Sequence, residues 1–298
     1  MNARSGRLAV VIAALFGLSL FFVACGDDKK SDTTASTAAT TAADSSIAVP
    51  AEFKGKTLVV ASDASYAPNE FFDKDGKTVV GMDVDLINAI AAKLGLKADV
   101  KNAPFDGIIP GIKAGKYQVG VSSFTDNKER EATVDFATYF TAGSSFYTAT
   151  DGGPTVNTLA DLCGLKVAAQ KGTVQADDAT AQSKKCTADG KKAVDVQIFP
   201  DQNGVNLALK SGRVQVAMAD SPVAAYAVKQ SNGAFKLVGE SYDNAPYGIA
   251  VPKDSGLAQP MVDAIKALIA DGTYKEILTK WGVESGAITD PQVNGATS

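Results

Sequence analysis

Histidine is absent from this chain of 298 residues. This absence excludes the Ser-His-Asp and Cys-His catalytic arrangements and most zinc sites, because all of them depend on imidazole. Basic residues are not in surplus either: 29 lysines and arginines stand against 33 aspartates and glutamates, which gives a net charge of −4. A nucleic-acid partner is therefore not expected. We predict no metal and no cofactor, and an enzyme would have to rely on carboxylates or lysine.

Only three cysteines occur, and the first directly follows an apolar segment near the N-terminus. Arg4 and Arg7 precede this segment, and Cys25 ends it. A charged start and a short apolar run predict an export signal over residues 1–24, and not a membrane-spanning helix. Residues 22–25 (Phe-Val-Ala-Cys) resemble the lipobox of bacterial lipoproteins, which implies acylation of Cys25. The alternative is an ordinary signal peptide followed by an incidental cysteine.

The segment after Cys25 is polar. Residues 27–46 are rich in Asp, Lys, Ser, Thr and Ala and contain no aromatic residue, so they cannot form a core. We predict that residues 25–54 are an acylated cysteine and a flexible tether. The folded part would then be anchored by lipid at the extracytoplasmic face of the cell membrane.

The other two cysteines are Cys163 and Cys186. An even pair in an exported protein predicts a disulfide. It would close a loop of about 24 residues and stabilise the fold by about 3 kcal/mol in the chain-entropy model. The alternative is a pair of buried free thiols.

Residues 107–121 and 204–218 are two versions of one unit, with apolar residues and glycines in step. Each pattern predicts an amphipathic helix that ends at a glycine, Gly115 or Gly212, and then a short buried strand. The first strand leads into Ser122 and Ser123, and the second leads into Asp220 and Ser221. Two similar α/β lobes with polar groups at facing strand ends would form a cleft.

Boundaries between the lobes come from strand patterns. Residues 144–150 alternate in polarity, so we place the first crossing between lobes there. We also predict a helix capped by Asp83 and a second helix capped by Ser221, with Pro222 in its first turn. The predicted organisation is lobe 1 at residues 55–143 and 243–285, lobe 2 at residues 144–242, and a C-terminal tail at residues 286–298.

Seven short motifs match one known family in order over about residues 55–283. They are residues 63–68 (Asp-Ala-Ser-Tyr-Ala-Pro), 81–86 (Gly-Met-Asp-Val-Asp-Leu), 122–130 (Ser-Ser-Phe-Thr-Asp-Asn-Lys-Glu-Arg), 134–136 (Val-Asp-Phe), 171–173 (Lys-Gly-Thr), Asp220, and 271–274 (Asp-Gly-Thr-Tyr). The chain resembles the polar amino-acid-binding proteins of ABC importers, solute-binding family 3. The resemblance implies an α/β fold of the type II periplasmic-binding-protein class: a two-lobed clamp with two crossing hinge strands. It also implies a monomer that binds a free L-amino acid and delivers it to the transmembrane subunits of an importer.

The resemblance assigns the ligand's two α-groups to opposite lobes. Arg130 aligns with the arginine that binds the α-carboxylate, and its planar fork suits a bidentate contact. Thr125, Thr173 and the backbone N–H of Val174 complete that site. Asp220, helped by Ser123, aligns with the acid that pairs with the α-ammonium. The alternatives are a solvated Arg130 in a charged run and an Asp220 that caps a helix.

Four further residues align with the walls of the side-chain pocket: Asp63, Tyr66, Phe105 and Gln170. Asp63 favours a ligand that donates hydrogen bonds, so we predict a basic or amide side chain and weaker binding of acidic ones. Tyr66 and Phe105 would hold the ligand between their rings, or they could belong to the lobe core instead.

Two other functions are open at this point. The fold also occurs in dehydratase-like enzymes, which need a carboxylic acid at the reacting atom. Glu70 is the one glutamate that we consider for this role, and we expect it in a loop outside the cleft. The third possibility is a ligand-sensing receptor lobe for a signalling partner. Binding without chemistry is the prediction that we favour.

Overall fold

The computed structural model describes Asp44 and residues 46–296. The predicted export signal, Cys25 and most of the predicted tether lie outside the described residues. None of the helices in the described part is long and apolar enough to cross a membrane.

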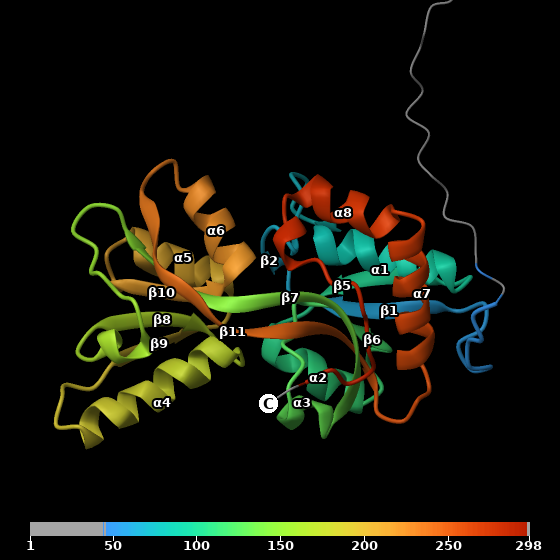
Figure 1. Cartoon of the computed structure of the whole chain (residues 1–298), viewed down its shortest axis with the longest axis horizontal. Coiled ribbons are helices and arrows are strands. Elements are labelled where there is room, and N and C mark those ends of the chain that lie inside the picture. Colours follow the sequence, from blue (N-terminus) through green and yellow to red (C-terminus); the bar gives the residue numbers. More distant parts are fainter. Residues whose placement is uncertain (1–43, 45, 297–298) are drawn as a thin grey trace, which may run out of the picture. The chain divides into compact units, whose positions relative to one another are not determined.

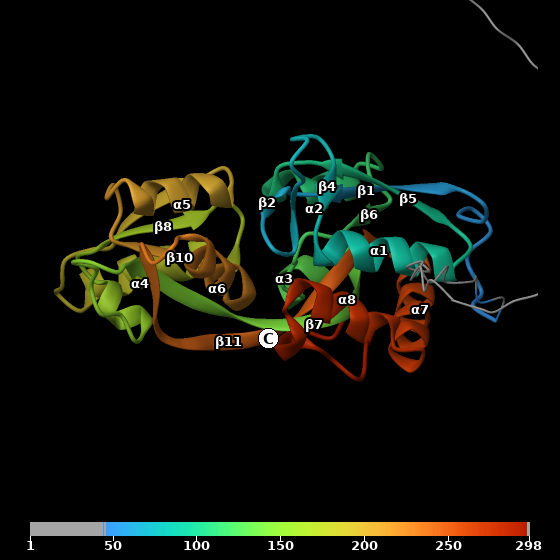
Figure 2. The same ribbon diagram turned by 90° about the horizontal axis from the view of Figure 1, so that it is seen from above.

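Eight strands form one mixed sheet in the order β5-β1-β6-β11-β7-β10-β8-β9. Lobe 1 contributes three parallel strands, and lobe 2 contributes three more beyond the central pair. The central strands β7 and β11 are long and antiparallel, and Figures 1 and 2 show them running between the two lobes. The strands are β1 (Thr57–Ser62), β5 (Lys97–Asn102), β6 (Val119–Gly120), β7 (Val134–Ala149), β8 (Lys166–Gln170), β9 (Asp195–Phe199), β10 (Val216–Asp220) and β11 (Phe235–Pro252).

Helices cover the sheet on both lobes, and a small second sheet lies beside lobe 1. Lobe 1 carries α1 (Met82–Lys93), α2 (Phe105–Lys113), α3 (Lys128–Glu131), α7 (Ala258–Ala270), α8 (Thr273–Trp281) and a short 3₁₀ helix (Glu284–Gly286). Lobe 2 carries a 3₁₀ helix (Leu159–Leu162), α4 (Val174–Ala188), α5 (Gln202–Lys210) and α6 (Ser221–Gln230). The small sheet consists of β2 (Ser65–Tyr66), β3 (Glu70–Phe72) and β4 (Val79–Val80).

These elements confirm the predicted clamp architecture with two crossing strands. The crossing begins earlier than residues 144–150, because β7 is continuous from Val134 to Ala149. Almost all residues of β7 are buried. A strand that is buried on both faces shows no alternation of polar and apolar residues, so the sequence pattern did not reveal the first half of β7. The numerical limits of the two lobes stay a prediction.

The two related units have the predicted form. Helices α2 and α5 are each followed by a glycine with positive φ, 75° at Gly115 and 71° at Gly212, and then by strands β6 and β10. Glycine adopts this left-handed conformation without a steric penalty, which is why the helix can stop there. The sharp stops place the ends of β6 and β10 at corresponding points of the two lobes.

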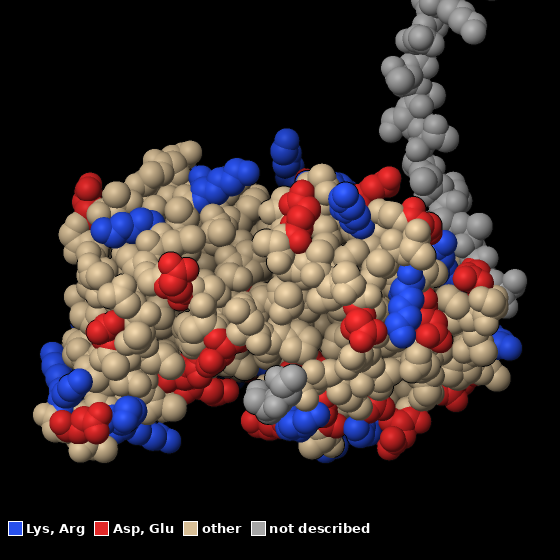
Figure 3. Space-filling view, viewed as in Figure 1, with Lys and Arg blue, Asp and Glu red and all other residues tan. Residues whose placement is uncertain are grey.

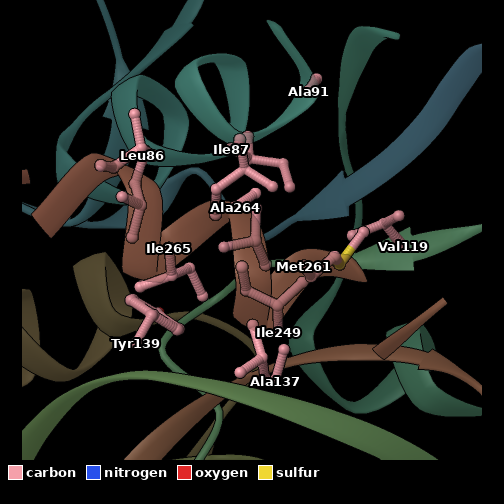
Figure 4. Packing of buried hydrophobic residues seen from close by; sticks show 14 of the residues in the cluster. Leu86, Ile87, Ala91, Val119, Ala137, Tyr139, Ile249, Met261, Ala264 and Ile265 are labelled. Carbon is pink, nitrogen blue, oxygen red and sulfur yellow. The ribbon is translucent and has the colours of Figure 1, made fainter. Parts of the chain in front are cut away.

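Lobe 1 is held by an apolar cluster between the sheet and helices α1 and α7. Figure 4 shows Leu86 and Ile87 of α1 against Ala264 and Ile265 of α7, with Ile249 of β11 below them. All five side chains are fully buried. Burying a leucine or isoleucine contributes about 1.5–3 kcal/mol. This cluster therefore ties the C-terminal helices to the first lobe and fixes the base from which the crossing strands leave.

Two predicted helix caps are wrong. The N-cap of α1 is Gly81, and the carboxylate of Asp83 points into the protein, where it accepts hydrogen bonds from Ser123 and Tyr139. At α6 the N-cap residue is Asp220 and not Ser221, although no side-chain bond caps the helix. In both cases a buried polar contact takes the carboxylate away from the helix end.

The predicted disulfide is confirmed. Cys163 and Cys186 form a disulfide. The bond links the end of the first 3₁₀ helix to the last turn of α4, and Cys186 is fully buried. The alternative of two free thiols is therefore excluded.

Candidate functional site

A cavity lies between the lobes at the carboxyl ends of β1, β6, β8 and β10. Hereafter it is called the cleft cavity. All ten residues predicted for the ligand site line it, together with three that were not predicted, Glu70, Ser122 and Gln175. The ten predicted residues are Asp63, Tyr66, Phe105, Ser123, Thr125, Arg130, Gln170, Thr173, Val174 and Asp220.

Arg130 is fixed at the cleft cavity by two hydrogen bonds and two rings. Its guanidinium donates to the carbonyl oxygen of Thr125 at 2.8 Å and to that of Gly172 at 3.0 Å. It lies 5.6 Å from the ring centroids of both Phe105 and Phe124, which stack on each other at 4.6 Å. Burial lowers the pKa of Arg130 from its ordinary value. Arg130 therefore faces the cleft cavity as a desolvated cation with further N–H groups available to an anion.

The first turn of α4 approaches the same region. Thr173 is its N-cap, and the side chain of Thr173 accepts a hydrogen bond from the backbone N–H of Ala176. Val174 and Gln175 follow in the first turn, and both line the cleft cavity. The N-terminus of a 15-residue helix carries a partial positive charge. Together with Arg130 it forms a region that suits a carboxylate.

Asp220 brings a buried carboxylate from lobe 2. Its Oδ1 accepts a hydrogen bond of 2.7 Å from Nε2 of Gln175, and its backbone N–H donates to the hydroxyl of Tyr66 at 3.0 Å. Burial raises the pKa of Asp220 from its ordinary value. No ion pair among the described residues includes it. The carboxylate does not cap α6, so it is available to a cation in the cleft cavity.

Asp63 occupies the wall formed by lobe 1. Its Oδ1 accepts from the hydroxyl of Ser65 at 2.6 Å, and its Oδ2 accepts from the backbone N–H of Phe105 at 2.9 Å. Nε2 of Gln170, from lobe 2, donates to the same Oδ2 at 3.0 Å. Burial raises the pKa of Asp63 despite these hydrogen bonds. Gln170 is therefore a direct link between the two lobes.

The expectation that Glu70 lies in a loop outside the cleft is wrong. Glu70 begins strand β3, is fully buried and lines the cleft cavity. Its Oε1 and Oε2 accept long hydrogen bonds from the hydroxyls of Ser122 at 3.2 Å and Ser123 at 3.3 Å. Burial and then the nearby charge of Asp83 raise its pKa well above the ordinary value. The sequence offered little indication of this placement, because β3 has just three residues and precedes an exposed polar turn. The position of Glu70, two residues after Pro68 of the first family motif, was the only available signal.

Three of the remaining contacts also join the two lobes. The backbone N–H of Gln202 donates to the hydroxyl of Ser65 at 3.1 Å. Lys171 and Asp106 form an ion pair of 2.7 Å. The rings of Phe71 and Tyr226 lie 6.5 Å apart. The structure therefore shows a closed cleft.

The charges at the cleft cavity are unequal. Three acids, Asp63, Glu70 and Asp220, face one base, Arg130. Within the described residues no group of three His, Cys, Asp or Glu side chains could hold a metal ion. The arrangement can therefore pair both groups of a zwitterion and has negative charge left for a cationic or hydrogen-bond-donating side chain.

The model of the bacterial extracellular solute-binding proteins, family 3, matches residues 58–284. The arginine-binding protein ArgT of Corynebacterium glutamicum is 35% identical to the chain over 238 residues, which cover 80% of this chain and 78% of ArgT. The matched region contains every residue that lines the cleft cavity.

Two solved structures are similar to the chain in fold and sequence. An ancestral arginine-binding protein bound to arginine has a TM-score of 0.69 and 38% identity, and the match covers 77% of this chain and 99% of that protein. The ancestral amino acid-binding protein AncCDT-1, a precursor of cyclohexadienyl dehydratase, has a TM-score of 0.68 and 33% identity over 76% of this chain and 95% of that protein.

Proposed function

The chain belongs to the bacterial extracellular solute-binding proteins, family 3, and from this premise we propose that it binds a free basic amino acid for uptake by an ABC importer. Arginine and lysine are the expected ligands. A glutamine-like amide is the weaker candidate. The observation that carries this proposal is the set of three buried acids and one arginine around the cleft cavity.

The α-groups of the ligand account for two of the four charges. Arg130, with Thr125 and the first turn of α4, pairs with the α-carboxylate. Asp220, with Ser123, pairs with the α-ammonium. Because an unpaired buried charge costs several kcal/mol, each group needs its partner. These partners come from different lobes, so ligand binding favours the closed state, where both pairs are complete.

The distal side chain of the ligand then meets Asp63 and Glu70. An amino acid with a neutral side chain leaves these two buried acids without a cationic partner. A guanidinium or ammonium group supplies the missing positive charge, and Tyr66 and Phe105 pack against its aliphatic stem. An acidic side chain would instead place like charges together, which costs several kcal/mol.

The region beside the cleft cavity is negatively charged, like the cleft cavity itself. A second, wider cavity adjoins the cleft cavity through their shared residues Thr125, Val174 and Asp220. Asp178 and Asp243 also line it. Figure 3 shows acidic side chains gathered along the lower edge where the two lobes meet. Negative charge at the entrance favours the arrival of cationic ligands.

An enzyme on the same fold is the second candidate, because Glu70 supplies the buried carboxylic acid that a dehydratase-like reaction requires. AncCDT-1 is described as the precursor of such an enzyme. Turnover would consume the ligand, whereas a binding protein releases it unchanged.

One experiment separates these functions. A calorimetric panel of arginine, lysine, histidine, glutamine and glutamate, followed by mass spectrometry of the ligand recovered after long incubation, names the ligand and detects turnover. We expect binding of arginine or lysine, recovery of unchanged ligand, and at least about tenfold weaker binding of glutamate, which corresponds to 1.4 kcal/mol. Tight glutamate binding would contradict the proposal that Asp63 and Glu70 face the side chain of the ligand.

The importer and the lipid anchor complete the proposal. An acylated Cys25 holds the protein at the membrane, and the polar residues 27–46 allow the clamp to reach the transmembrane subunits. The clamp acts as a monomer, since both walls of the cleft cavity come from one chain.

A further inference from the structure

Glu70 and Asp83 are two fully buried carboxylic acids on neighbouring elements, β3 and α1. The hydroxyl of Ser123 lies 3.3 Å from Oε2 of Glu70 and 3.5 Å from Oδ2 of Asp83. Neither acid forms an ion pair among the described residues. Two like charges this close in a desolvated site cannot both be ionised cheaply, so the pair retains a proton.

The hydrogen bonds decide which of the two acids is ionised. Asp83 accepts 2.8 Å hydrogen bonds from the backbone N–H of Ser123 and from the hydroxyl of Tyr139. Glu70 accepts only the two long bonds from the hydroxyls of Ser122 and Ser123. Short donor bonds favour the charged form, so Asp83 is the anion and Glu70 carries the proton. Glu70 is also the member of the pair that lines the cleft cavity.

Building on the proposed function, we propose that Glu70 and Asp83 share one proton in the ligand-free protein and that the cationic side chain of the bound amino acid displaces it. Glu70 then ionises against the guanidinium or ammonium group, and the proton leaves to solvent. Asp83 does not touch the ligand, and it acts through Glu70 as a positioning residue. The pair thereby makes the affinity for basic amino acids depend on pH, whereas the affinity for neutral ones does not.

Other titratable groups surround the pair and bear on the test. They are Asp63 after β1, Tyr66 on β2, Tyr139 on β7, and Arg130 and Asp220 on the cleft cavity. Burial raises the pKa values of Tyr66 and Tyr139 well above the ordinary value, so both stay neutral. Asp63 is the one competing source of a proton at the distal end of the ligand. Variants must therefore distinguish Glu70 from Asp63.

The direction of the effect follows from linkage. Burial and the charge of Asp83 hold the pKa of Glu70 high in the free protein, and an adjacent cation lowers the pKa of a carboxyl group. Affinity for a basic amino acid therefore rises with pH until the free pair has lost its proton. For one whole proton the dissociation constant falls about tenfold per pH unit within that window.

The test is calorimetry of arginine and glutamine binding in buffers with different ionisation enthalpies, which counts the protons released. We expect arginine to release close to one proton at every pH at which the free pair still holds its proton, and glutamine to release none. In Glu70→Gln the release with arginine should vanish and the affinity for arginine should fall at least about tenfold, a change of 1.4 kcal/mol. Glutamine affinity should change less than arginine affinity in this variant, because the glutamine side chain brings no positive charge to position 70.

Three further variants complete the test. Asp83→Asn should lower proton release, because Glu70 loses its neighbouring charge. Asp63→Asn should weaken arginine binding but retain the release. Asp126→Asn is the matched control, since Asp126 has a pKa raised to about 7 by burial but does not line the cleft cavity. It should leave both affinity and release unchanged.

The outcomes separate this inference from the proposed function. Failure to bind any amino acid contradicts the proposed function. Arginine binding without proton release overturns the shared proton alone. Proton release that persists in Glu70→Gln and disappears in Asp63→Asn would assign the proton to Asp63. This outcome would also overturn the inference that Glu70 and Asp83 share the proton.

Discussion

Replacing Asp220 by asparagine separates the contribution of its charge to ligand binding from its contribution to stability. In the closed cleft Asp220 is 7% exposed, and its carboxylate accepts one hydrogen bond from Gln175 and has no cationic partner within the described ion pairs. Burial raises its pKa, so the ionised form costs stability. Asparagine keeps an oxygen for Gln175 and removes the charge. The ligand-free variant should therefore melt at the same temperature as the wild type or above it.

Ligand binding should respond in the opposite direction. If Asp220 is the partner of the α-ammonium, the variant leaves a buried ammonium group unpaired, which costs about 3–5 kcal/mol. That cost corresponds to a loss of affinity between about 150-fold and about 5,000-fold. Calorimetric titration with arginine measures the affinity, and differential scanning calorimetry without ligand measures the stability.

A matched control is available beside the site. Asp178 also has a pKa raised by burial and accepts a hydrogen bond from Tyr242, but it lines only the adjoining cavity. Asp178→Asn should therefore leave the dissociation constant nearly unchanged. Wild-type affinity in Asp220→Asn would refute the ammonium role, and equal losses in both variants would point to the general negative charge of this region.

Four further expectations concern separate features of the chain. Arg130→Ala should weaken arginine binding at least about a hundredfold, and Arg130→Lys should recover only part of it, because lysine lacks the bidentate fork; an unchanged dissociation constant would remove Arg130 from the site. Serine at both Cys163 and Cys186 should lower the free energy of unfolding by about 3 kcal/mol in denaturant titrations without changing affinity. Burial raises the pKa values of both Glu70 and Asp83, so the proton that this pair holds stabilises the fold at low pH, and this stability is lost as the pH rises through the raised pKa of the pair; without ligand, the wild type should lose more stability over this range than Glu70→Gln, in which the pair has no proton to lose. Cys25→Ser should release the protein from the membrane fraction or leave its precursor uncleaved, and a wild type that takes up no labelled fatty acid would exclude the anchor.

The sequence predicted the clamp well because its signals are local and repeated. A helix, a glycine and a short strand occur twice, and each copy ends in polar residues. The ends of parallel strands meet at one sheet edge, so these polar residues had to lie near each other. Family motifs then supplied the residues from other segments, and all of the predicted residues line one cavity.

Tertiary burial explains what the sequence did not predict. Asp83 has the type and position of a helix cap, but the backbone N–H of Ser123 and the hydroxyl of Tyr139 hold its side chain inside the protein. Both donors are distant in sequence, 40 and 56 residues away. Ser123 has a φ of 51°, which directs its N–H toward Asp83. No local pattern encodes that conformation for a serine.

The placement of Glu70 follows from the same contacts. Its neighbours Ser122 and Ser123 lie at the end of β6, so the unit that builds the ligand site also carries the hydroxyls that reach Glu70 and Asp83. The buried acid pair is therefore continuous with the cleft cavity. An acid that served only the fold could be replaced by an apolar residue of similar size, because a buried charge without a cationic partner is unfavourable. Retaining two such acids beside the distal pocket makes physical sense when the positive charge arrives with the ligand.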